Sequence, residues 1–563
     1  MQFCFALINS FLFSSFIKSP HILYRGVYFI LVLILANVSF CFSQNTNIIL
    51  GRPTDTSITV SVLFNQVDEY YLEYGTQQGE YGYTSANYTS IANLPEEINL
   101  NNLIPNTKYF YRLNYKVPGS INFIHSTEFS FITQRTPGST FTFAIEADEH
   151  LYDIKGNLNM YNVTLQNEAN DHPDFMLSLG DIFGDDHNYS TITAAELDDL
   201  HSYYRPVLGK ICHSIPFYVC LGNHEGEKEY YLVQTAPNPN MAIPATLARK
   251  KYFPNPFPNS FYSGNTTVES NGIGYPENYF SWTWGDALFV VLDVYRDACD
   301  TSDKPLGWAW SLGLPQYTWL KNTLETSTSK YKFVFAHHTR GEGRGGILTA
   351  ITNEWGGYQR QVGLVGLNFK FGLNRPAADG WTKPIHQLFV DNKVNIFFQG
   401  HDHLFAREQL DSVIYQEVPM PSDSTYNIGM LANADAYLSD TLNGTGHLKV
   451  TVSPAYVRVD YIRAYLPADT VGGLHQNGEI AFTYYVRAND AYTFIGNGSW
   501  SDSNNWVEKK TPPANLPAGN AIYIDPVEGG ECVLNITQNI LQGAKIIVKP
   551  GKKLIVPGNL IIQ

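Results

Sequence analysis

The stretch Phe217-Tyr-Val-Cys-Leu-Gly-Asn-His-Glu225 decides how this chain is organised. Its apolar residues lead directly into a glycine and three polar residues, the pattern of a buried strand that ends at the carboxyl edge of a sheet. Gly222 lets the backbone turn. Asn223 and His224 then offer an amide oxygen and an imidazole nitrogen, which are donors that suit a divalent metal. Taken alone, the stretch fits a glycine turn with a capping asparagine equally well.

Four other stretches repeat this arrangement of an apolar strand followed by oxygen or nitrogen donors. The apolar runs are residues 141–147, 175–179, 331–336 and 394–398. In the first and the last, one residue separates two donors, so both side chains point to the same side if the backbone stays extended. Chance does not account for five such strands in this order. The donors that follow the runs are Asp148 and His150, Asp181, His337 and His338, and His401 and His403.

The ordered motifs Asp-x-His, Gly-Asp, Gly-Asn-His-Glu, His and Gly-His-x-His resemble those of the calcineurin-like metallophosphoesterases over residues 141–465. The fibronectin-like pattern upstream makes the chain most similar to the purple acid phosphatase branch of that family. That branch usually has Gly-Asp-x-x-Tyr and no histidine in its first motif. Here Gly184 stands at the tyrosine position and His150 is present, so the resemblance implies that His150 replaces the tyrosinate ligand.

The resemblance also implies a dinuclear metal site and a hydrolytic reaction. Two divalent ions, Fe, Zn or Mn, are expected, because a carboxylate can bridge two cations and neutral imidazoles suit these metals. A hydroxide that bridges the ions would attack phosphorus, and His224 would stabilise the transition state or protonate the leaving oxygen. The implied ligands are Asp148, His150, Asp181 and His403 for the first metal, and Asp181, Asn223, His337 and His401 for the second.

Several neighbouring residues have two interpretations. His338 is the alternative to His337 as a metal ligand and is otherwise a candidate for substrate binding. Arg340 can hold a phosphate oxygen or lie solvated on a loop. Residues 185–187, Asp-Asp-His, fit a solvated loop better than a segment that contacts the substrate or forms hydrogen bonds to the metal ligands. The histidines as a set could be unrelated core and surface residues, but the motifs around them argue against that interpretation.

The N-terminal 43 residues predict export. Lys18 and Arg25 precede residues 27–42, an apolar run without charge that ends near small residues. The run is short for a membrane span, which needs about 20 residues. A secretory signal peptide at residues 1–43 fits best, and an uncleaved anchor is the alternative. We therefore expect no stable transmembrane span and a location that is secreted, periplasmic or at the cell surface.

Length and composition favour a globular protein of two or three domains. The chain has 563 residues, of which 44% are hydrophobic and 14% aromatic, enough to bury a large core. A formal net charge of −15 argues against a nucleic-acid-binding surface. A phosphorylated small molecule or protein still fits as the substrate, because bound divalent cations would dominate the local electric field.

Changes of pattern along the chain predict three domains after the leader. Residues 45–136 alternate as short strands and resemble a fibronectin type III sandwich, which is all-β. Residues 139–490 form the catalytic domain, for which the resemblance implies an α/β fold of four layers in the order αββα. Four β-patterned segments after His403 are expected to complete its second sheet. Residues 491–563 form a small β module that weakly resembles the coils of a β-helix in bacterial surface proteins, which suggests association with the cell surface.

Three functions are consistent with these features. The first is a secreted, dinuclear, metal-dependent phosphatase that acts on phosphomonoesters. The second is a phosphodiesterase that acts on nucleotides or lipid headgroups, because both reactions can use the same metal core. The third is a non-catalytic surface binding protein, and the complete set of ligands argues against it, because a decayed site should have lost at least one member.

Overall fold

The computed structural model describes residues 46–116, 118–152, 156–183, 192–227, 241–296, 312–339, 345–357, 371–373, 375–428, 436–437 and 440–563. The leader predicted at residues 1–43 lies outside these ranges, and so do Gly184, residues 185–187 and Arg340. Of the helices in the described ranges, none is both long enough and apolar enough to cross a membrane.

The N-terminal region is an all-β sandwich with its own core. One sheet contains β1 (Thr46–Gly51), β2 (Ser57–Phe64) and β6 (Glu96–Asn101). The other contains β4 (Tyr83–Thr84), β3 (Glu69–Gly75), β7 (Lys108–Lys116) and β8 (Ile124–His125), with β5 (Tyr88–Thr89) on β3 and β9 (Phe129–Ile132) on β7. Val60, Leu72 and Tyr111 lie in the core between them. This confirms the all-β prediction, and the likeness to fibronectin type III stays a prediction.

Two mixed sheets pack face to face in the region that follows the N-terminal sandwich. The six-stranded sheet contains, in spatial order, β12 (Phe217–Val219), β11 (Met176–Ser178), β10 (Phe141–Glu146), β21 (Gly446–Val452), β22 (Tyr456–Arg463) and β23 (Ile480–Arg487). The eight-stranded sheet contains β13 (Ser263–Gly264), β14 (Phe280–Trp284), β15 (Ala287–Val291), β16 (Tyr331–Phe335), β17 (Ile396–Gln399), β19 (Val413–Glu417), β18 (Phe405–Leu410) and β20 (Thr441–Leu442). Phe143 and Phe289 meet between the sheets, with ring centroids 5.1 Å apart.

The strands that lead to the predicted donors run in the same direction within each sheet. β10, β11 and β12 are parallel neighbours, and so are β15, β16, β17 and β19. Parallel strands bring their carboxyl ends to one edge of a sheet. The polar residues that follow β10, β11 and β12 therefore collect at one edge, and those that follow β16 and β17 collect at another.

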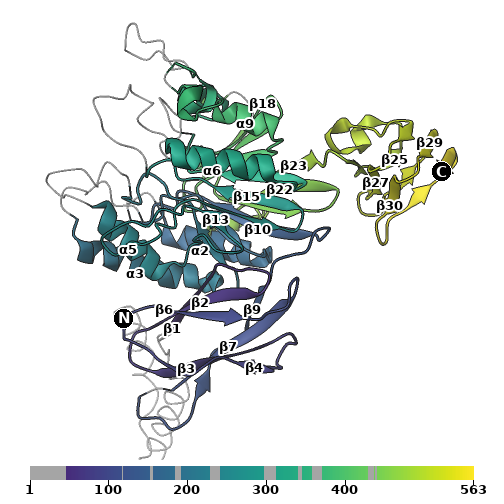
Figure 1. Ribbon diagram of the computed structural model, residues 1–563. Helices are drawn as coiled ribbons and strands as arrows, with labels where there is room; N and C mark the ends of the chain where they lie inside the picture. The colour runs from purple at the N-terminus through teal and green to yellow at the C-terminus, as the bar shows by residue number, and fades with distance from the viewer. Residues whose placement is uncertain are drawn as a thin grey trace, which may run out of the picture. The chain divides into compact units, whose positions relative to one another are not determined.

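Helices cover the outer face of each sheet, which gives four layers (Figure 1). Side chains alternate along a strand: Phe143 and Ile145 of β10 face the other sheet, and Ala144 packs with α2 (Leu158–Asn170) and α3 (Ala194–Cys212). On the far side, α6 (Gly313–Thr326) and α9 (Ile385–Asp391) cover the sheet of β16. The predicted αββα fold is confirmed. The other α-helices among the described residues of this region are α5 (Ala242–Tyr252), α7 (Ile347–Ala350) and α8 (Asn353–Gly356).

The prediction that the four β-patterned segments after His403 all complete one sheet is wrong. β19 pairs with β17 in the eight-stranded sheet. β21 pairs with β10 in the six-stranded sheet, followed by β22 and β23. The β pattern gives the period of each strand but not its partner, because both sheets offer a similar apolar face to the interior.

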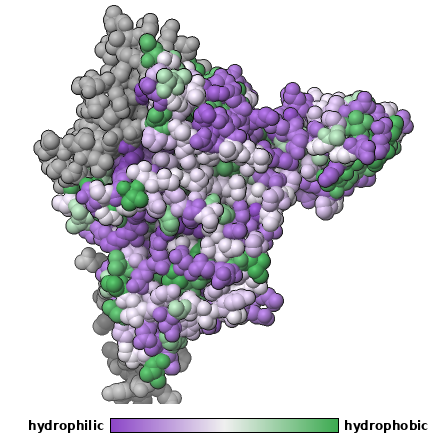
Figure 2. Space-filling model, in the orientation of Figure 1, coloured by the Kyte–Doolittle hydropathy of each residue, from purple (hydrophilic) through white to green (hydrophobic). Residues whose placement is uncertain are grey.

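The C-terminal module is a parallel β-helix in which each turn of the chain adds one strand to each of three sheets. Its apolar interior includes Phe494, Trp500 and Trp506. Figure 2 shows apolar side chains on its surface as well, among them Val548 and Ile562. The sheets are β24 (Ala491–Phe494), β27 (Ala521–Ile524) and β30 (Lys545–Val548); β25 (Gly498–Ser499), β28 (Cys532–Val533) and β31 (Leu554–Ile555); and β26 (Asn515–Leu516), β29 (Thr537–Ile540) and β32 (Asn559–Ile562).

Candidate metal centre

The backbone turns sharply at the predicted donors. Five of them have positive φ angles: 63° at Asp148, 44° at His150, 60° at Asp181, 80° at His401 and 59° at His403. Such angles are uncommon for residues other than glycine and often mark functional sites. The backbone at the paired donors is therefore not extended, so the condition under which both side chains of a pair would point to the same side is not met. At these turns, the directions of the side chains do not follow the two-residue alternation of a strand.

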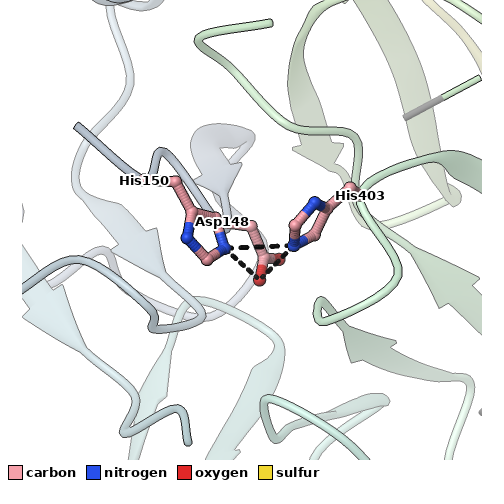
Figure 3. A group of neighbouring side chains, drawn as sticks. All are labelled: Asp148, His150 and His403. Carbon is pink, nitrogen blue, oxygen red and sulfur yellow. Dashed lines mark hydrogen bonds and ion pairs between the residues drawn. The ribbon is translucent and has the colours of Figure 1, made fainter. Parts of the chain in front are cut away.

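The first group of donors consists of Asp148, His150 and His403 (Figure 3). All three are buried, and their donor atoms lie within 4.8 Å of one another. The Nε2 atoms of His150 and His403 are 3.0 Å apart. Asp148 Oδ1 lies 3.8 Å from the first and 3.5 Å from the second. The side chains converge from two segments that are far apart in the sequence.

The buried Oδ1 atom of Asp148 supports a cation at this position. No described residue forms a hydrogen bond with this oxygen. The other oxygen, Oδ2, accepts a hydrogen bond from the backbone N–H of His401 at 2.7 Å. A buried polar atom without a hydrogen bond is costly, and a divalent ion held with the two imidazoles would satisfy it.

The second group consists of Asp181, His337 and His401. His337 Nε2 lies 3.2 Å from Asp181 Oδ2 and 3.2 Å from His401 Nδ1. Asn223 adds its side-chain oxygen at 3.1 Å from the same nitrogen. Carboxylate, imidazole and amide donors in this combination fit Zn, Fe or Mn.

Asp181 lies between the two groups. Its Oδ2 atom is 3.9 Å from His150 Nε2 in addition to its contact with His337. Across the same gap, His337 Nε2 lies 3.8 Å from Asp148 Oδ1. A carboxylate in this place can reach two ions at once. The distances are therefore consistent with the bridging position predicted for Asp181.

Charge within the site favours ionised carboxylates. Burial opposes ionisation of Asp181, but the imidazole of His337 and then that of His224 hold the pKa of Asp181 well below its ordinary value. Burial likewise lowers the pKa of His337, but Asp181 and Asp148 raise it to about 9. The carboxylates and imidazoles of the site are thus paired in charge, and a metal ion bound to His337 would take the place of the proton on its ring.

The two predicted histidines that are not assigned as ligands lie close to the groups. The backbone N–H of His224 donates to Asp181 Oδ1 at 2.8 Å, and its ring centroid is 5.4 Å from that of His150. His338 packs its ring 4.4 Å from His401, while His337 contributes its nitrogen to the second group. Arg340 lies outside the described residues.

Glu225 has a role that the sequence does not reveal. Its carboxylate accepts hydrogen bonds from the backbone N–H groups of Asp181 at 3.0 Å and Ile182 at 2.7 Å. It also accepts one from Gly222. The side chain therefore ties the loop after β11 to the loop after β12. Its place in the Gly-Asn-His-Glu motif is a signal of importance, but not of this function.

Comparisons with known proteins agree with this geometry. Residues 141–405 match the family described as Calcineurin-like phosphoesterase. A solved structure of PhoD is 15% identical, covers 79% of this chain and 91% of its own length, and has a TM-score of 0.55. The purple acid phosphatase PPD1 of yellow lupin (Lupinus luteus) is 14% identical, with 78% and 74% covered and a TM-score of 0.50. At such identities these structures show a shared fold. No curated protein sequence matches the chain significantly.

Proposed function

Because the chain carries a calcineurin-like phosphoesterase domain at residues 141–405 and is thus a metal-dependent phosphoesterase, we propose that it hydrolyses phosphomonoesters with two divalent metal ions. The observation that carries the proposal is that Asp181, a member of the second donor group, also lies 3.9 Å from His150 of the first. An enzyme is thereby favoured over a non-catalytic surface binding protein.

Each of the two proposed ions has its own set of ligands. Neutral imidazoles and carboxylates in these numbers suit Zn, Fe(II) or Mn. When bound, two such ions would lower the pKa of a water held between them and neutralise charge on the phosphate oxygens. The ligands proposed are Asp148, His150, Asp181 and His403 for one ion, and Asp181, Asn223, His337 and His401 for the other.

His224 is proposed as the residue that acts on the substrate. Its Nε2 atom lies 3.8 Å from Asp181 Oδ2, and its side chain is 13% exposed, so it faces the centre without belonging to either group. An imidazole there can stabilise charge on the phosphoryl group or give a proton to the leaving oxygen. His338 remains a proposed contact for substrate, and so does Arg340.

Export and surface association complete the proposal. Residues 1–43 are proposed as a signal peptide that delivers the domains at 45–136, 139–490 and 491–563 outside the cytoplasm. The C-terminal module is proposed to contact the cell surface. A phosphodiesterase on nucleotides or lipid headgroups remains the second candidate, because the same metal core serves both reactions.

The test compares a monoester with a diester. Purified protein is assayed with p-nitrophenyl phosphate and bis-p-nitrophenyl phosphate, before and after chelation, beside an analysis of metal content. We expect two metal equivalents, faster hydrolysis of the monoester, loss of activity with chelator and recovery with Zn, Mn or Fe(II). Faster hydrolysis of the diester would favour the second candidate. Absence of metal and of both activities would refute the proposal.

A further inference from the structure

His150 is held by a neighbouring tyrosine. The hydroxyl of Tyr152 lies 2.9 Å from Nδ1 of His150. The other ring nitrogen, Nε2, faces His403 and Asp148, as Figure 3 shows. The two nitrogens of this buried imidazole therefore have separate surroundings, one with the donor group and one with a phenol.

The chemistry of imidazole indicates which atom donates in the hydrogen bond between His150 and Tyr152. A neutral imidazole has one N–H and one lone pair. If Nε2 of His150 gives its lone pair to a metal, Nδ1 must carry the proton, and the oxygen of Tyr152 can accept it. A histidine that binds a metal usually donates its second N–H to such a partner, which fixes the tautomer and the orientation of the ring.

We propose that Tyr152 is a positioning residue for the first metal ion, whose hydroxyl accepts the Nδ1–H of His150 and keeps Nε2 directed at the ion. This rests on the proposed function, because it assumes that the first donor group binds a metal. Tyr152 acts through His150 and contacts no reacting atom.

The position of Tyr152 also separates it from a metal-binding tyrosinate. Its hydroxyl lies beside Nδ1, on the side of the ring away from the donor group. A phenol there cannot bind the ion that Nε2 binds. Tyr152 therefore supports a neutral ligand and does not supply the anionic one that the tyrosine of the purple acid phosphatase pattern would supply.

Removing the hydroxyl alone tests the inference. Tyr152→Phe keeps the aromatic ring, whose centroid lies 5.5 Å from that of His150 and 6.0 Å from that of His224. Loss of such an outer partner typically lowers metal affinity about 10–100-fold. The variant and the wild type, both loaded with zinc, are titrated with a competing chelator while released zinc is measured. We expect one of the two ions to leave the variant at about 10–100-fold lower chelator concentration.

The controls separate this inference from the proposed function. Tyr203→Phe, at an exposed tyrosine of α3, should release both ions as the wild type does. Thermal unfolding in excess chelator should be the same for all three proteins, which excludes a folding defect. Equal retention of both ions by Tyr152→Phe and wild type would overturn the role of Tyr152 alone, and so would equal weakening of both ions. A wild type that binds neither ion would overturn the proposed function as well.

Discussion

The two donor groups follow similar strand ends, but their histidines are held in different ways. In the first group, a side chain holds the ring of His150, through the hydroxyl of Tyr152 at 2.9 Å. In the second group, the main chain holds the ring of His337, whose Nδ1 donates to the carbonyl of Leu179 at 2.8 Å. A point substitution can remove a hydroxyl but leaves a backbone carbonyl in place. The second ligand is therefore fixed by the fold, and the first by a replaceable residue.

The two groups also differ in burial and in the hydrogen bonds that fix their loops. The three donors of the first group are buried, whereas His401 of the second is partly exposed. Glu225 adds backbone hydrogen bonds that fix the loop carrying Asp181. Two sites with similar metal donors can thus depend on different hydrogen-bond partners. Substitutions of these partners should therefore change metal binding at one site without changing it at the other.

The largest effect is expected where the two groups meet. Asp181→Asn removes the carboxylate proposed to bridge the two ions, so we expect it to abolish hydrolysis and to lower the content of both ions. Activity and metal content are measured on the same preparation. Asp198→Asn, at a partly exposed carboxylate of α3, is the control. A variant that kept full activity and two ions would show that Asp181 is not shared.

A large effect on turnover alone is expected at His224. His224→Ala should lower kcat by about 10²–10⁴-fold, the usual contribution of a general acid or base, while both ions remain bound. The measurement is steady-state hydrolysis beside metal analysis. Loss of one metal equivalent would instead place His224 among the ligands and would redefine one of the two groups.

A small effect is expected at the tyrosine beside the second group. The hydroxyl of Tyr295 lies 3.4 Å from Asn223 Oδ1, a long hydrogen bond whose net value is at the low end of about 0.5–1.5 kcal/mol. Tyr295→Phe should therefore weaken the second ion by roughly two- to threefold, less than Tyr152→Phe weakens the first. Chelator competition on both variants makes the comparison. A larger effect of Tyr295→Phe than of Tyr152→Phe would show that the second ion depends more on a tyrosine hydroxyl than the first does.

No visible absorption is expected from either group. Tyr152 faces away from the donors of the first group, and His150 supplies a neutral nitrogen in place of a phenolate. A site with less ligand charge favours divalent over trivalent ions. The protein as purified should therefore be colourless, which a visible spectrum recorded beside a metal analysis checks. A strong tyrosinate-to-iron band would show that a tyrosine binds the metal directly.

The sequence predicts which donors meet but not how the chain presents them. Apolar runs that end in polar residues are enough to place Asp148 and Asp181 together, because parallel strands share an edge. His337 follows a strand of the other sheet and joins them only through the packing of the two sheets. The backbone at the paired donors is not extended, since φ is positive at His150 and His403. Local propensity does not predict such angles, because they are imposed by the structure around the site.

The supporting residues could not be predicted from their positions. Tyr152 follows His150 by two residues, but proximity in sequence does not reveal that its hydroxyl reaches Nδ1. Glu225 stands in a motif that draws attention to it, yet its hydrogen bonds reach a different loop, 43 or 44 residues away. Contacts of this kind depend on tertiary placement, which hydrophobic period alone does not specify.

The β-helix at the C-terminus offers a means of adjusting length. Each turn adds one strand to each sheet in the same register, as Ile522 pairs with Ile546 between β27 and β30, and stability in such repeats comes chiefly from neighbouring turns. One duplicated turn would extend the module by about 4.7–4.9 Å, the spacing between adjacent strands. The length of the module can therefore be changed in fixed steps by adding or removing whole turns.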